Sequence, residues 1–150
     1  MFAKKERDER YMTILNCSIE NHPEFDFQIN LRSDIDPSLV RKILDIVHEE
    51  SIDCYLEHDY LRGHVFYVPV KAYFGVADES RYQPPVAGSV FLNDAYNQIG
   101  FICGEIDNSR KVAKFGSAPV DKLEQLGKYL WETSASSFKP TLLRMKITAA

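Results

Sequence analysis

Arg62 and His64 stand on either side of Gly63, just before an alternating apolar segment, and Tyr67 follows three residues later. An arginine can hold a carboxylate or a phosphate through two parallel hydrogen bonds, and a neighbouring histidine can exchange protons near neutral pH. These residue types therefore predict a site for an anionic group, with acid–base chemistry as an extension. A solvated loop end with a histidine packed on its edge explains the same residues, and this simpler interpretation is favoured.

Cys103 lies beside Phe101 in a second apolar segment. It would be a candidate nucleophile if the fold placed His64 next to it. No cationic neighbour or helix start is evident that would lower the pKa of this thiol, so a buried, inert cysteine is the favoured interpretation.

Metal and cofactor sites find little support in the sequence. His58 lies between Glu57 and Asp59, but the distance to His64 suits a metal site on neither a strand nor a helix. No glycine-rich phosphate loop is found, and the three cysteines have neither metal-ligand nor redox spacing. The sequence predicts no bound metal and no cofactor.

Composition limits the class of protein. The chain has 150 residues, a formal net charge of −4 and 45% hydrophobic residues, which is typical of one globular domain. A negative chain is a poor partner for nucleic acid, and no apolar run approaches the ~18 residues of a membrane span. Residues 1–10 are highly charged and lack the apolar core of a signal peptide, so they predict a flexible arm before a single domain over 11–150. A cytoplasmic location is the default expectation.

The elements that must position these side chains are mainly strands. Period-two alternation is clearest over Phe25–Leu31, and two apolar stripes at helical spacing predict helices over 36–50 and 119–132. Asp36-Pro37 is typical of a helix start. Further strands are expected over 11–19, 54–56, 64–71, 90–92, 99–103, 112–115 and 141–148.

Two details of this pattern bear on a site. Pro69 lies inside the 64–71 strand and cannot donate to a ladder, so a pairing must be missing there or the strand must bulge. Residues 72–86 contain glycine and two prolines and predict a long surface loop, of the kind that is usually functional or mobile.

The order of elements resembles the cyclophilin-like fold, a closed β-barrel with a helix over each open end, and is closest to small bacterial cyclophilin-like proteins of unknown function. Four short phrases support the resemblance, which covers most of residues 11–148. They are Phe25–Leu44, Gly63–Val70, Val86–Val90 with the hairpin up to Gly104, and Phe115–Val120. The resemblance implies a mainly β, closed barrel of seven or eight strands with two helices.

True cyclophilins are prolyl isomerases, but their active-site phrases are missing here. The resemblance would place the catalytic arginine near Val65-Phe66-Tyr67, and no arginine stands in that position. The methionine-, glutamine- and glycine-containing segment is replaced by Tyr73–Val76, and the tryptophan-containing segment has no counterpart. We therefore expect no prolyl isomerase activity.

The faces of two strands predict a groove on the outside of the barrel. Phe66, Val68 and Val70 form the more apolar face of their strand and should point inward, which leaves Tyr67 outside. On the glycine-containing strand, Gly100 and Gly104 are expected to face inward, at a sharp bend of the sheet. Phe101 and Cys103 would then point outward.

If the two strands are neighbours, the groove contains Arg62, His64, Tyr67, Phe101 and Cys103. Three hypotheses follow. The first is a barrel without isomerase activity that binds a small molecule, with or without a negative charge, or a peptide in this groove. The second is an enzyme that uses Arg62 and His64 there, and the third is a structural protein in which the aromatic residues form a homo-oligomer contact.

Overall fold

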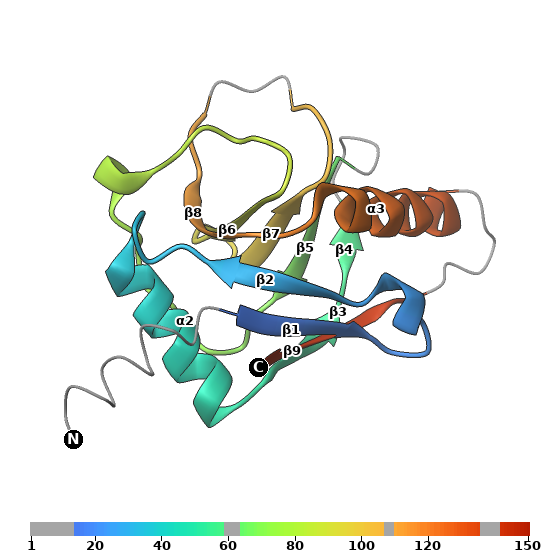
Figure 1. Cartoon of the computed structure of the whole chain (residues 1–150), viewed down its shortest axis with the longest axis horizontal. Coiled ribbons are helices and arrows are strands. Elements are labelled where there is room, and N and C mark those ends of the chain that lie inside the picture. The colour runs from blue at the N-terminus through green and yellow to red at the C-terminus, as the bar shows by residue number, and fades with distance from the viewer. Residues whose placement is uncertain (1–13, 59–63, 107–109, 136–141) are drawn as a thin grey trace.

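The computed structural model describes residues 14–58, 64–106, 110–135 and 142–150, and within them the chain forms nine strands and two α-helices (Figure 1). The predicted arm over residues 1–10 lies outside this part of the chain. The elements are β1 (Ile14–Ile19), β2 (Phe27–Leu31), α2 (Pro37–Glu49), β3 (Ile52–Tyr55), β4 (Glu57–His58), β5 (Val65–Pro69), β6 (Ser89–Asn93), β7 (Gln98–Ile102), β8 (Ala113–Ser117), α3 (Val120–Ala135) and β9 (Arg144–Ala149). Two short 3-10 helices, η1 (Pro23–Phe25) and η2 (Glu79–Arg81), lie between them.

The strands form one antiparallel sheet in the order β3-β9-β1-β2-β8-β6-β7-β5-β4. The two ends of this order, β3 and β4, are consecutive pieces of one extended segment joined at Leu56. β3 pairs with β9 and β4 pairs with β5, so this segment links the first and last parts of the sheet. The result is a nearly closed barrel, which confirms the predicted mainly β fold.

Both helices begin and pack as their sequences indicate. The carboxylate of Asp36 accepts a hydrogen bond from the backbone N–H of Leu39 (3.1 Å), which caps α2 before Pro37. The two helices lie on opposite sides of the strands in Figure 1. Each buries an apolar stripe in the same core, with Leu39, Val40, Ile43 and Val47 from α2 and Leu123, Leu126 and Leu130 from α3.

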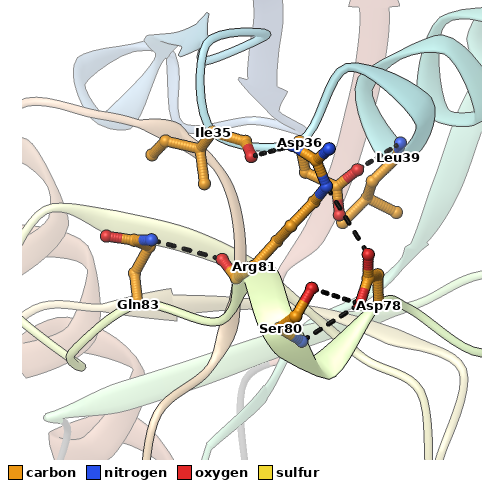
Figure 2. Close-up of polar contacts among 7 residues, drawn as sticks. All are labelled: Ile35, Asp36, Leu39, Asp78, Ser80, Arg81 and Gln83. Atoms are coloured by element: carbon orange, nitrogen blue, oxygen red, sulfur yellow. Dashed lines mark hydrogen bonds and ion pairs between the residues drawn. The ribbon is translucent and has the colours of Figure 1, made fainter.

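The predicted 72–86 loop is attached to the barrel at several points. Near its end, Arg81 in η2 donates a hydrogen bond to the carbonyl of Ile35 (3.1 Å), next to the start of α2 (Figure 2). Arg81 also pairs with Asp78 (3.5 Å), and Asp78 in turn accepts hydrogen bonds from the backbone and side chain of Ser80. These contacts connect the loop to the helix that closes one side of the core.

The predicted faces of β7 are wrong. Phe66 faces the core, and Phe101 lies directly opposite it in the β5–β7 register, so both side chains share one face. Phe101 is 0% exposed, stacks on Phe66 with ring centroids 5.0 Å apart, and meets the edge of Phe27 at 5.7 Å. Cys103 is also part of this core. The inward orientation of Phe66, Val68 and Val70 is confirmed.

Gly100 of β7 and Gly104, which follows this strand, face outward, and neighbouring rings cover them. A Cβ atom on Gly100 would come within 2.4 Å of the Phe91 ring. Phe91 belongs to a second, smaller apolar cluster with Val65 and Ile102, against which Tyr67 packs. Close approach of another group, and not a bend of the sheet, therefore explains the glycine spacing.

Candidate functional site

Among the residues expected to form the external groove, His64 is exposed and well oriented. Its Nδ1 lies 2.7 Å from the carbonyl oxygen of Glu105. Because that oxygen can only accept a hydrogen bond, Nδ1 must carry the proton, and in the neutral ring Nε2 is left as an acceptor. The imidazole rests on Gly104, where an added Cβ would lie 2.8 Å from the ring. Arg62, the expected partner, lies outside the described residues.

The other groove residues do not form one outer surface. Phe101 and Cys103 lie inside the barrel, whereas Tyr67 is half-buried outside, with its ring edge-on to Phe91 at 6.1 Å. Burial raises the pKa of the Cys103 thiol to about 12, although a hydrogen bond to its own backbone acts in the opposite direction. The thiol is thus protonated at neutral pH, which argues against a nucleophilic role.

The structure instead shows an open pocket on the outside of the barrel, between β3 and the end of β5. We call it the seam pocket; its volume is about 350 Å³. Its walls come from the end of α2, from β3, from the residues around Pro69 and from the first residue of β9. The lining residues are Ile46, Glu49, Glu50, Ser51, Ile52, Asp53, Pro69, Val70, Lys71, Ala72 and Arg144.

The pocket exists because the pairing of the sheet stops here. On the β4 side, the ladder of β5 ends at the Glu57–Tyr67 pair, while β3 pairs only with β9. On the other side, Pro69 still lies opposite Gln98 of β7. The missing pairing expected at Pro69 therefore falls between β3 and β5, and this prediction is confirmed.

An ion pair forms one wall of the seam pocket. Arg144 Nε lies 2.6 Å from Asp53 Oδ1, and the guanidinium also lies 5.6 Å from the centre of the Tyr55 ring. The hydrogen bond from Arg144 holds the pKa of Asp53 below its usual range, and the positive charges of Arg144, Lys146 and Lys71 act in the same direction. Asp53 is therefore ionised at neutral pH.

The part of the lining that comes from the end of α2 is negative. Glu49 is the last residue of α2 and Glu50 caps it, donating its backbone N–H to the carbonyl of Ile46. The carbonyl end of a helix carries a partial negative charge of about half an electron, and two adjacent carboxylates add to it. The seam pocket thus has an acidic side at α2 and a side with two cations, Lys71 and Arg144.

Sequence reasoning missed this pocket, although one signal pointed to it. Pro69 indicated where a ladder had to end, but nothing in the sequence alone indicated that β3 lay across that gap.

Within the described residues, no three metal-ligating side chains gather in a geometry suited to a metal ion. In the same residues, no helix is both long and apolar enough to cross a membrane.

Comparison with known proteins shows the fold. No protein-family profile and no curated protein sequence matches the chain. Solved structures do resemble it, and three of them, described next, establish that the chain has a cyclophilin-like fold.

The first is McbB in complex with tryptophan, with a TM-score of 0.75 and 16% identity over 89% of this chain. The second is the hypothetical protein AF2241 from Archaeoglobus fulgidus (TM-score 0.60, 14% identity, 92% of this chain and 95% of that one). The third is the Mimivirus cyclophilin (0.55, 11%, 91% and 86%). The chain spans 44% of the length of McbB.

Proposed function

We propose that this cyclophilin-like barrel binds a small zwitterion of the amino-acid class in the seam pocket. We also propose that it has no prolyl isomerase activity. The observation that carries the proposal is an open pocket of about 350 Å³ between an acidic helix end and two cationic side chains. Small-molecule sites in proteins have volumes of ~300–1,000 Å³, so this pocket lies at the lower end of the range.

The charges on the two walls suit a zwitterion. An ammonium group would be stabilised near Glu49 and Glu50, where the helix end adds to their negative potential. A carboxylate would be stabilised by Lys71 and by the guanidinium of Arg144, which has further N–H groups to donate to a second anionic partner besides Asp53. Because the related barrel McbB was solved with tryptophan, an amino acid is a chemically consistent ligand class.

The proposed site lies outside the barrel, as the sequence predicted, but at a different place from the predicted groove. His64 lies just before β5, whereas Pro69 and Lys71 lie at the other end of that strand. Five to seven residues of extended chain separate them by roughly 16–23 Å, so one small ligand cannot contact both. The enzyme hypothesis based on Arg62 and His64 remains a prediction, and it is independent of the seam pocket.

A thermal-shift screen of the twenty free amino acids, followed by calorimetric titration, tests the proposal. A ligand at 100 times its Kd stabilises the folded chain by ~2.7 kcal/mol, which is a shift of several degrees for a domain of this size. Lys71→Ala should weaken binding by about tenfold. Lys128→Ala, which removes an exposed lysine on α3, is the matched control and should bind normally.

Two results would contradict the proposal. One is that no amino acid shifts the melting temperature of the wild-type chain. The other is that Lys71→Ala and Lys128→Ala change the affinity equally, because the site would then lie elsewhere.

A further inference from the structure

The segment that follows the seam pocket is held tightly against the turn between β6 and β7. Asn97, which has a left-handed backbone (φ 52°), donates its side-chain amide to the carbonyls of Val70 (2.6 Å) and Ala72 (2.7 Å). Its side-chain oxygen accepts from the backbone N–H of Phe74 (3.1 Å). Three hydrogen bonds from one side chain thus fix the backbone next to the pocket.

Further contacts hold the rest of this segment. Phe74 is buried in the main core, and its carbonyl accepts a hydrogen bond from Lys42 of α2 (3.3 Å). Asp94 accepts hydrogen bonds from the backbone N–H of Ala77 (3.4 Å) and from the hydroxyl of Tyr82 (3.3 Å). The segment between Val70 and Ala77 is therefore anchored at four of its residues.

Large side chains nevertheless point into solvent from this fixed backbone. Tyr73 and Tyr96 are each 76% exposed, and Val76 is 73% exposed. Summed over the three side chains, the exposed surface is roughly 400 Å² and largely apolar, counted from the size of such side chains. Exposed apolar surface often marks a binding site where it forms one patch. We call these three residues the apolar rim.

The apolar rim adjoins the seam pocket along the chain and through hydrogen bonds. Lys71 and Ala72 line the pocket, and Tyr73 is the next residue. Tyr96 directly precedes Asn97, whose amide lies 2.7 Å from the carbonyl of Ala72. Tyr73 therefore starts within a few ångströms of the pocket wall, since consecutive Cα atoms are about 3.8 Å apart, and Tyr96 starts within roughly 10 Å of it.

We propose that the ligand of the seam pocket carries a large apolar side chain, which lies against Tyr73 and Tyr96 on the apolar rim. This inference rests on the proposed function and specifies its ligand. The charged walls hold the amino and carboxylate groups, whereas the rim selects an apolar side chain over a small or polar one. Because the backbone that carries Tyr73 is already held in place, binding does not have to order it.

This chemistry is shared by a free amino acid and by a dipeptide, which also carries one amino group and one carboxylate. L-phenylalanine and glycine represent the free amino acids, and the dipeptides Phe-Gly and Gly-Gly represent the peptides. Calorimetric titration of all four into the wild-type chain, Tyr73→Ala and Val86→Ala gives the comparison. Val86 is a control because it is 53% exposed and lies near Ile102, at the far end of β7 from Asn97.

The wild-type chain should bind the phenylalanine probe at least tenfold more tightly than its glycine counterpart. Tyr73→Ala should remove about tenfold of that preference and leave the glycine affinity unchanged, while Val86→Ala should behave like the wild type. Whether the free or the peptide pair shows the preference identifies the source of the ligand.

Three outcomes overturn the inference, and they differ from one another. Equal binding of phenylalanine and glycine probes refutes the apolar rim but leaves the proposed function intact. Absence of binding by all four refutes the inference, and it refutes the proposed function as well if the screen of twenty amino acids is also negative. If sedimentation shows that the wild-type chain is a dimer and Tyr73→Ala a monomer, with unchanged ligand preference, the rim instead contacts a second copy of the chain.

Discussion

Truncation of Phe101 tests whether β7 presents this ring to the core or to solvent. The ring is 0% exposed, stacked on Phe66 at 5.0 Å and edge-on to Phe27 at 5.7 Å. Phe→Ala substitutions at such positions cost about 3–5 kcal/mol, because they remove buried surface and leave a cavity. For a chain of this length, this corresponds to a fall in Tm of roughly 6–20 °C.

Tyr67→Ala is the matched comparison on the neighbouring strand. Tyr67 is only half-buried and packs on Phe91 in the smaller outer cluster. Its loss should cost about 1–2 kcal/mol, in proportion to the smaller area withdrawn from water. Urea unfolding of both variants and the wild type, monitored by circular dichroism, gives the two free energies directly.

The reasoning would be refuted if Phe101→Ala changed the free energy of unfolding by no more than ~0.5 kcal/mol, the range of surface substitutions. If Phe101→Ala does not fold, Phe101→Leu replaces it, because most of the volume is kept and the expected loss is roughly 1–2 kcal/mol. A cost for Phe101→Leu below that of Tyr67→Ala would contradict the assigned faces equally well.

Five other measurements check separate parts of the structure and the expected lack of isomerase activity. The hydroxyl of Ser89 is fully buried without a hydrogen-bond partner in the described residues, so Ser89→Ala should leave the unfolding free energy unchanged or raise it by up to about 1 kcal/mol; a larger loss in urea unfolding would reveal a partner. Half-buried Cys54 should react with iodoacetamide before Cys103 at pH 8, as read by mass spectrometry of the native protein, and the reverse order would contradict the assigned burial. The pKa of Cys103 is raised in the folded state, so its contribution to stability is complete below the ordinary thiol pKa of ~8.5 and is lost as the pH rises toward about 12. The Cys103→Ala variant should not show this alkaline loss of stability. The lowered pKa of Asp53 has the opposite effect: its contribution to stability is present above the ordinary pKa of ~3.9 and is lost on acidification. Asp53→Asn should therefore make stability depend less on pH in the acid range. The difference should be no more than ~1 kcal/mol, because the Asp53–Arg144 pair is well exposed. A proline-peptide isomerisation assay should show no acceleration over buffer, and an increase in rate proportional to protein concentration that survives repurification would contradict this expectation.

Much of the fold could be predicted from periodicity and capping. The alternation of Phe25–Leu31 identified β2, except for Phe25, which belongs to η1. Asp36-Pro37 located the start of α2 because the cap depends on local backbone geometry alone. The second helix continues to Ala135, three residues past its predicted end. The prediction was short because a helix end without an adjacent glycine or proline is poorly marked in sequence.

The inside and outside of β7 could not be predicted in the same way. Both faces of this strand are buried, so alternation gives no contrast between polar and apolar sides. Glycines at alternate positions are compatible with a sharp bend or with a close approach; the bend was the prediction, and the sequence could not show that the ring of Phe91 covers Gly100. The register with β5 decides the question, since it places Phe101 opposite Phe66, and register depends on tertiary pairing.

The position of the seam pocket follows from how this barrel closes. One short segment pairs with β9 through β3 and then with β5 through β4. Between these two pairings lies Leu56, which is buried and donates its N–H to the carbonyl of Leu143 (2.8 Å). A segment that leaves one neighbour for another cannot also pair with β5 along β3, so a gap must remain beside Pro69. The topology thus creates the opening, whereas the side chains around it decide what binds. Proteins with this fold can therefore share a barrel and differ entirely in ligand.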